Sequence, residues 1–244
     1  MPPPLVLVHP FPLDPSALAP LAERLGPEVQ VLRPGLPGFG GVVRASAPSI
    51  DGFADHVAAA VRGLPGRRAV VGGVSMGGYV ALSVAARRPD LVAGLVLIDT
   101  KAQADDNAAR AGRERAIAAI EAGRTGEVLD DLLPRLVAAD ATPTARAEIR
   151  AVADAQDPGA LIDALAAMRD RPDRTRALPE ITAPALVVVG AEDVVTPPEV
   201  ARTLAAGIPN ATCEEVAGAG HLTPLEAPDA LAALIRTFLA RLGG

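Results

Sequence analysis

The amino-acid sequence predicts an α/β fold: a mostly parallel sheet of about six strands, helices on both faces of that sheet, and an inserted block of helices. In residues 1–100 and 181–244, short apolar runs typical of buried strands alternate with helical patterns, so we expect these two parts to form one core. Across residues 101–180 only helical patterns occur, which predicts a helical lid inserted into that core. With 244 residues, half of them hydrophobic, the chain can bury a substantial interior.

The N-terminal part predicts two strands, a long loop and two helices. Residues 5–8 and 29–32 are apolar and β-branched, and a short helix begins between them at Pro15 or Ser16. Prolines and glycines interrupt residues 34–48, which predicts a surface loop. Ser49 is a suitable N-cap for the helix that follows, because its hydroxyl can accept a free N–H of the first turn.

The stretch over residues 69–86 predicts a strand, a sharp turn and a helix. The turn, Gly73-Val74-Ser75-Met76-Gly77, fits the pattern G-x-S-x-G, which sets a nucleophilic serine on a strained strand-to-helix connection. Glycine is required because such a turn leaves no room for side chains two positions before and after the serine. The start of the helix directs free N–H groups and a positive dipole end at the place where an oxyanion would form.

The insertion follows a strand over residues 93–98, which ends at Asp99. Four helical patterns then succeed one another without a strand-like run between them. Thr142 and Asp157 are expected N-caps, because each precedes a proline at the first helical position. These patterns predict a block of helices that is charged outside and aliphatic inside.

The alternation of strands and helices resumes after the insertion. Residues 185–190 and 211–216 predict the last two strands, and we expect Thr196 and Glu199 to form a capping box that opens the helix between them. Apolar residues at helical spacing then predict an amphipathic closing helix: Leu231, Leu234, Ile235, Phe238, Leu239 and Leu242.

Two loops supply the groups that a serine nucleophile needs. A serine hydroxyl is a poor nucleophile near neutral pH unless a base lies within hydrogen-bond reach and a third group orients that base. Asp193 follows one predicted strand in Gly190-Ala191-Glu192-Asp193, and His221 follows the last strand in Gly218-Ala219-Gly220-His221. Because the carboxyl ends of parallel strands meet at one edge of a sheet, we expect Ser75, Asp193 and His221 to lie together there.

These motifs resemble the nucleophile elbow, acid loop and histidine loop of the α/β-hydrolase fold superfamily. The resemblance covers nearly all of the chain outside the helical insertion, which sits where the superfamily carries its lid. It implies catalytic roles for Ser75, Asp193 and His221 and, in His9-Pro10-Phe11-Pro12, an oxyanion loop similar to His-Gly-x-Pro.

Two features depart from the superfamily pattern. The chain has no counterpart of the first two of the eight usual strands, and Pro10 stands where a glycine is usual. Proline removes its own N–H, but the N–H of Phe11, the donor that the resemblance implies, is still present. The backbone N–H groups of Phe11 and Met76 are therefore the expected oxyanion hole.

Other polar residues of the chain have alternative or purely structural roles to consider. Glu192 and Asp99 are rivals of Asp193 for the role of the acid, since one is its neighbour and the other also ends a strand. His9 is expected to brace its loop by hydrogen bonds, and His56 to lie on the surface of a helix. Cys213 is expected to be a buried strand residue.

Composition excludes several classes of function. The net charge is −6 and no basic cluster follows a nucleic-acid backbone, so we expect no nucleic-acid partner. One cysteine cannot form an intrachain disulfide, and with only three histidines a zinc site is not expected. The N-terminus lacks the pattern of a signal peptide, and no apolar run reaches the ~20 residues that span a bilayer. We therefore expect a cytoplasmic protein without a membrane partner.

The sequence thus predicts a serine hydrolase that cleaves a small carboxylic ester or lactone through an acyl-enzyme, with no metal or organic cofactor. The resemblance within the superfamily extends to small bacterial carboxylesterases, enol-lactone hydrolases and cofactor-free haloperoxidase-like enzymes. A perhydrolase activity is therefore one alternative. Another is a non-catalytic ligand receptor on the same fold. The predicted lid is generic Ala/Leu helix, so it leaves the acyl preference open, and the oligomeric state is open too.

Overall fold

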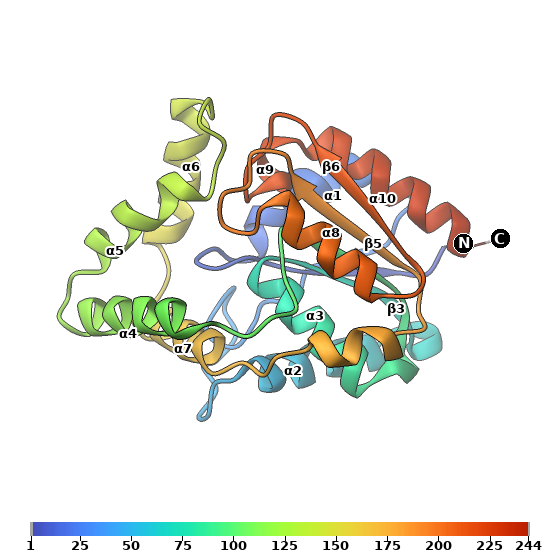
Figure 1. Ribbon diagram of the computed structural model, residues 1–244, viewed down its shortest axis with the longest axis horizontal. Coiled ribbons are helices and arrows are strands. Elements are labelled where there is room, and N and C mark those ends of the chain that lie inside the picture. The colour runs from blue at the N-terminus through green and yellow to red at the C-terminus, as the bar shows by residue number, and fades with distance from the viewer. Residues whose placement is uncertain (1, 244) are drawn as a thin grey trace.

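The computed structural model describes residues 2–243 and is built on one parallel sheet (Figure 1). Within these residues the six strands pair in the order β2-β1-β3-β4-β5-β6, and every pairing is parallel, as predicted. The strands are β1 (Leu5–Val8), β2 (Val31–Leu32), β3 (Ala69–Val74), β4 (Val92–Ile98), β5 (Ala185–Gly190) and β6 (Ala211–Val216). The edge strand β2 is shorter than the predicted 29–32, because only two of its residues pair with β1.

Successive side chains of the central strands enter two different hydrophobic layers. Leu5 and Leu7 of β1 pack into the layer under α1 (Ala19–Leu25) and α10 (Pro228–Leu242). Val6 and Val8 pack into the opposite layer, under α2 (Ile50–Arg62), α3 (Met76–Arg87) and α8 (Pro198–Gly207). Figure 1 shows these two groups of helices on opposite sides of the sheet. Because helices cover both faces of the sheet, the central strands need apolar side chains on both faces, which appear in the sequence as continuous apolar runs.

The helical insertion lies between β4 and β5. It consists of α4 (Asn107–Glu121), α5 (Thr125–Leu132), α6 (Pro143–Asp154) and α7 (Pro158–Arg169). The predicted caps are confirmed: the N–H of Ala145 donates to Thr142 Oγ1 over 3.2 Å, and that of Ala160 donates to Asp157 Oδ1 over 2.9 Å. Local sequence therefore determines where α6 and α7 begin.

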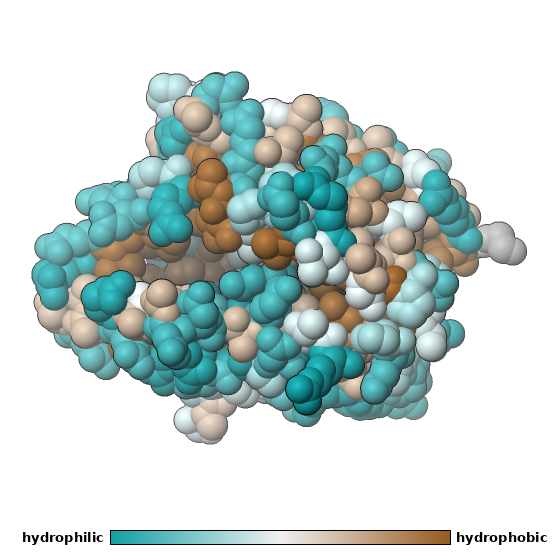
Figure 2. Space-filling view, viewed as in Figure 1, coloured by the Kyte–Doolittle hydropathy of each residue, from teal (hydrophilic) through white to brown (hydrophobic). Residues whose placement is uncertain are grey.

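The insertion has two halves that face each other. Helix α4 packs along α7, while α5 and α6 form a second pair on the other side (Figure 1). Figure 2 shows a hollow between these halves, with hydrophobic side chains along its wall. The chain termini lie at the far end of the molecule from the insertion.

Ion pairs fasten the α4–α7 half to the rest of the chain. Arg44, from the loop before α2, donates to Asp163 of α7 through two nitrogens, at 2.7 and 3.0 Å. Arg171 is buried, and it donates to the buried carboxylate of Asp105 over 2.6 Å while its guanidinium lies 4.1 Å from the ring centre of Tyr79. The first contact connects α7 with the loop before α2, and the contact with Tyr79 connects the segment after α7 with the first turn of α3.

The division into a core of residues 1–100 and 181–244 and a lid of residues 101–180 remains a prediction, and its end residues Met1 and Gly244 lie outside the described part of the chain. No helix in residues 2–243 has the length and apolar character needed to cross a membrane.

Candidate active site

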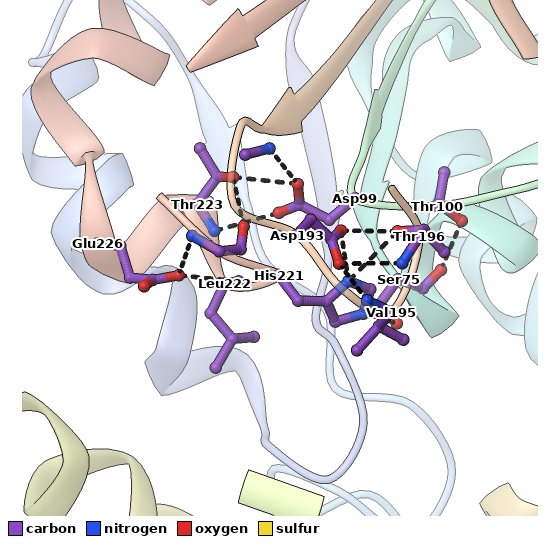
Figure 3. A network of polar contacts seen from close by, with 12 residues as sticks. Ser75, Asp99, Thr100, Asp193, Val195, Thr196, His221, Leu222, Thr223 and Glu226 are labelled. Carbon is purple, nitrogen blue, oxygen red and sulfur yellow. Dashed lines mark hydrogen bonds and ion pairs between the residues drawn. The ribbon is translucent and has the colours of Figure 1, made fainter. Parts of the chain in front are cut away.

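Three loops at the carboxyl edge of the sheet bring Ser75, Asp193 and His221 together (Figure 3). Ser75 stands between β3 and α3, Asp193 between β5 and α8, and His221 between β6 and the short helix α9 (Thr223–Glu226). His221 Nε2 lies 2.8 Å from Ser75 Oγ, and His221 Nδ1 lies 2.7 Å from Asp193 Oδ2. One imidazole therefore bridges the hydroxyl and the carboxylate, as the order of the motifs predicts.

The carboxylate of Asp193 is buried and fully engaged. Its Oδ1 accepts the N–H groups of Val195 at 2.7 Å and Thr196 at 2.9 Å, and its Oδ2 accepts the hydroxyl of Thr196 at 2.7 Å. Burial alone would raise the pKa of Asp193, but the hydrogen bond and charge of His221 and the donors of Thr196 hold the pKa below its ordinary value. The carboxylate is thus kept ionised, ready to hold the Nδ1–H of His221.

The expected capping role of Thr196 is wrong. Helix α8 begins after Pro197 without a side-chain cap, and the hydroxyl of Thr196 turns instead to Asp193 and lies 3.3 Å from His221 Nδ1. The pattern T-x-x-E was present, but the nearby carboxylate is the stronger acceptor because it carries a full charge. Thr196 is therefore part of the acid loop.

The elbow has the strained backbone that its sequence predicts. Ser75 has φ +52° and ψ −112°, a region that residues other than glycine rarely occupy. Thr100 Oγ1 donates to the carbonyl oxygen of Ser75 over 2.8 Å, and the N–H of Ser75 donates to Ile98 over 2.9 Å. These bonds attach the turn to β4 and to the residues that follow it. Ser75 is half-buried, whereas the other residues of 69–85 are buried.

The two elbow glycines are required by close backbone contacts. A Cβ on Gly73 would fall onto the backbone of Gly77, and a Cβ on Gly77 would fall onto the carbonyl of Val8. The strand, turn and helix therefore touch through backbone atoms, which is why the pattern needs glycine at both positions.

Replacing Gly77 by alanine is therefore expected to lower the free energy of unfolding by about 1–3 kcal/mol, because the added methyl overpacks a backbone contact. Gly112 in α4 is the matched control, since the nearest neighbour of its Cβ would be Arg115 Nη2 at 3.8 Å. Gly112→Ala should raise the free energy of unfolding by roughly 0.5–1 kcal/mol through helix propensity. Urea denaturation measures both changes, and equal stability of the two variants would contradict this account of the elbow.

The expected oxyanion donors occupy neighbouring loops. Met76 is the first residue of α3, where a backbone N–H has no partner within the helix. Phe11 follows β1, which pairs with β3 in a register that sets Val8 beside Gly73, so both loops leave the sheet at the same point. This is also where the strand order reverses, between β1 and β3. The oxyanion role of both residues remains a prediction.

His9 braces its loop, as the sequence analysis expects. Its Nε2 accepts the N–H of Leu36 over 3.3 Å, its Nδ1 lies 3.2 Å from the carbonyl oxygen of Pro10, and its ring packs against Phe39. The side chain is fully buried, and burial lowers its pKa to about 4. A neutral imidazole therefore ties the loop of Phe11 to the loop of Leu36.

Protonation of His9 should make stability depend on pH. The folded protein holds His9 neutral down to about pH 4, whereas the unfolded chain binds a proton near pH 6.5, so the stability is present above pH 6.5 and is lost as pH falls toward 4. We expect the stability advantage of the wild type over His9→Gln to shrink by on the order of 1–3 kcal/mol from pH 7.5 to pH 4.5. Urea denaturation of both proteins at the two values measures it. An advantage that does not change with pH would contradict the buried neutral state.

Neither Glu192 nor Asp99 forms a hydrogen bond or ion pair with the His221 side chain, whose polar partners are Ser75, Asp193 and Thr196. Glu192 is exposed. Asp99 is buried, and it accepts the N–H of Gly190 at 3.0 Å and the N–H and hydroxyl of Thr223 at 3.1 and 3.0 Å. Burial, and then the negative charge of Asp193, raise the pKa of Asp99 well above its ordinary value. Asp99 therefore joins the acid loop to the start of α9 and leaves the imidazole to Asp193.

His56 and Cys213 lie outside the loops that carry Ser75, Asp193 and His221. His56 is half-buried on α2, and Cys213 is a half-buried residue of the edge strand β6 and so less buried than expected. Among residues 2–243, no three His, Cys, Asp or Glu side chains are grouped so that they could hold a metal ion.

Comparison with known proteins agrees with this fold. The sequence profile described as the Alpha/beta hydrolase family matches residues 5–234. A pimeloyl-(acyl-carrier protein) methyl ester esterase from Aromatoleum aromaticum is 33% identical over 249 residues, which cover 96% of this chain and 96% of that protein.

Two solved structures are also similar. A thermophilic esterase from Thermogutta terrifontis is 34% identical, with a TM-score of 0.93 over 98% of this chain and 90% of its own. The enol-lactonase from Burkholderia xenovorans LB400 is 27% identical, with a TM-score of 0.89 over 98% of this chain and 92% of its own.

The chain belongs to the alpha/beta hydrolase family. The family match and the relatives confirm the expected superfamily, the expected fold and the expectation of an enzyme of the α/β-hydrolase type.

Proposed function

We propose that this protein is a carboxylic ester hydrolase that works through an acyl-enzyme on Ser75. The observation that carries the proposal is the unbroken path of hydrogen bonds from Ser75 Oγ through His221 to Asp193. The names of the relatives, an esterase, a methyl ester esterase and an enol-lactonase, support an ester or lactone as the substrate.

In the first half of the reaction, Ser75 Oγ attacks the ester carbonyl while His221 Nε2 takes the hydroxyl proton. Asp193 holds Nδ1–H, which keeps Nε2 free to accept and stabilises the imidazolium that forms. The same imidazolium then returns the proton to the departing alcohol. In the second half, His221 takes a proton from water, the resulting hydroxide attacks the acyl-enzyme, and the acid leaves as Ser75 recovers its proton.

Two backbone groups are assigned to the negative charge that develops on the carbonyl oxygen. Phe11 follows β1 and Met76 follows β3, two strands that pair with each other, and Met76 adds the positive end of the α3 dipole. One such donor is often worth roughly 3 kcal/mol of transition-state stabilisation. The His9 brace fixes the loop that carries Phe11.

We assign the lid to residues 101–180 and the acyl-binding wall to its α5–α6 half. A pocket of about 170 Å³ lies there, lined by Leu129, Asp130, Leu133, Pro134, Val137, Arg146, Ile149 and Arg150. Leu133 and Val137 share one hydrophobic cluster with Leu13 and with Leu222, the neighbour of His221. This apolar contact between the insertion and the site supports a substrate with an aliphatic acyl group.

The proposal is tested with a panel of p-nitrophenyl esters, simple methyl esters and lactones, each with and without hydrogen peroxide. Methyl esters and a lactone are included because the relatives are named for them. We expect hydrolysis of short aliphatic esters, and labelling of the protein by a fluorophosphonate. A rate that rises only with peroxide would favour the perhydrolase alternative. Tight ligand binding without labelling or turnover would favour a receptor.

A further inference from the structure

Glu226 joins the helical insertion to the loop that carries His221. Figure 3 shows Glu226 on the side of the histidine loop, beside Leu222. It is the last residue of α9, which begins two residues after His221. Its Oε2 accepts the N–H groups of Gly220 at 2.9 Å and Leu222 at 3.2 Å, the two neighbours of His221 in the chain. Its Oε1 accepts the N–H of Ala138 at 2.6 Å, in the segment between α5 and α6. One carboxylate therefore holds both flanks of the histidine and one point of the insertion.

The backbones of these two segments also touch directly. A Cβ on Gly220 would lie 2.5 Å from the nitrogen of Ala138 and 2.7 Å from the carbonyl carbon of Val137. The insertion is therefore seated against the histidine loop without a side chain between them. Residues 137–138 therefore contact Gly220 directly and are joined to Leu222 through the carboxylate of Glu226.

The histidine loop is held from a second side by Asp99. That carboxyl group accepts from Thr223 and Gly190, so it ties the loop to β4 and β5 within the core. Glu226, in contrast, ties the same loop to the insertion. Three donors converge on Glu226, which a carboxylate can satisfy with two acceptor oxygens and a glutamine cannot.

Taking the proposed function as given, we propose that Glu226 is a positioning residue: it keeps His221 aligned with Ser75 and makes that alignment depend on the seating of the insertion. The alignment is exacting, because a misplacement of ~1 Å from a catalytic geometry can cost about a hundredfold in rate. The hydrogen bonds of Glu226 are to the backbone on either side of His221, so their loss frees the imidazole without removing any group that reacts.

Three variants separate this role from a general loss of stability. Glu226→Ala removes every acceptor. Glu226→Gln keeps one acceptor oxygen, which can serve the two flanks of His221 but leaves Ala138 facing an amide NH₂. Glu192→Gln is the matched control, since it removes an exposed charge close enough to influence the pKa of Glu226.

Each variant is assayed with p-nitrophenyl butyrate well below its melting temperature, as determined by circular dichroism. Glu226→Ala should lower kcat about 10- to 100-fold with KM within about twofold, and should slow fluorophosphonate labelling of Ser75 by a similar factor. Glu226→Gln should fall between Glu226→Ala and the wild type, and Glu192→Gln should stay within about twofold of the wild type. The low-field proton resonance of the His221–Asp193 hydrogen bond should shift or broaden in Glu226→Ala, a change that a purely structural residue would not cause.

A fully folded Glu226→Ala with wild-type kcat, labelling rate and imidazole resonance would overturn the inference. So would a loss of kcat that merely follows the unfolded fraction. Failure of the proposed function looks different, because the wild type itself would then show no labelling at Ser75. A labelled wild type with an equally fast Glu226→Ala would remove only the role of Glu226.

Discussion

Ser75→Ala is expected to lower kcat/KM for p-nitrophenyl butyrate by roughly 10⁴-fold or more, because the acyl-enzyme cannot form without the hydroxyl. Binding and the oxyanion donors remain, so a small residual rate over water should persist. Stability should change little, since the hydroxyl makes one hydrogen bond, to His221, and alanine meets the same positive φ as serine. Activity is measured by release of p-nitrophenol, and stability by thermal unfolding.

Ser83→Ala is the matched control on the same helix. Ser83 is buried, and its hydroxyl donates to Asp51 of α2 over 2.6 Å. It therefore lies on the side of α3 that faces α2. Its loss should lower the free energy of unfolding by about 1 kcal/mol and leave kcat/KM near the wild-type value. If Ser75→Ala kept most of the activity, or if both variants lost it equally, the nucleophile assignment would be wrong.

Asp193→Asn should lower kcat/KM by about 10³- to 10⁴-fold. The amide cannot accept the Nδ1–H of His221 with its NH₂ end, so the imidazole is no longer held in the reactive tautomer and the imidazolium loses its counter-charge. Three further donors surround the carboxylate, so the amide also leaves one of them without an acceptor. The pH dependence of kcat/KM should change together with the rate.

Asp99→Asn is the control for the assignment of Asp193 as the acid that orients His221. Asp99 accepts three donors, so an amide of the same shape leaves one of them without an acceptor, and the expected cost of the substitution is in stability. We expect kcat/KM within a fewfold of the wild type, with the effect confined to stability. A large loss in Asp99→Asn together with a small loss in Asp193→Asn would reverse the two roles.

The positions of the central strands and of the elbow can be predicted from the sequence for physical reasons. Central strands such as residues 69–74 are buried on both faces, so they appear as unbroken apolar runs. The caps at Thr142 and Asp157 act on neighbouring N–H groups, so a short local pattern suffices to find them. Parallel strands then bring Ser75, Asp193 and His221 to one edge whatever the detailed packing.

Specific side-chain contacts, above all those between distant segments, could not be predicted from the sequence. The sequence of Thr196 and Glu199 fits a helix cap, and only the structure shows that the hydroxyl of Thr196 donates to Asp193, three residues earlier. Glu226 carried no motif at all, since its partners Ala138 and Gly220 are brought together only by the seating of the insertion. The hollow between the halves of the insertion likewise depends on how α4, α5, α6 and α7 pack, and their Ala/Leu composition allows several arrangements.

The acyl-enzyme itself is the most direct test of the central claim that Ser75 is acylated with the help of His221. The reaction of the wild type with p-nitrophenyl butyrate is quenched in acid during turnover, and the protein is digested. The mass of the peptide that contains Ser75 is then measured by mass spectrometry. We expect this peptide to carry one butyryl group, and the same peptide from His221→Ala to carry none at the same quench time. Steady turnover with a butyryl group on another residue, or equal acylation in His221→Ala, would contradict the claim.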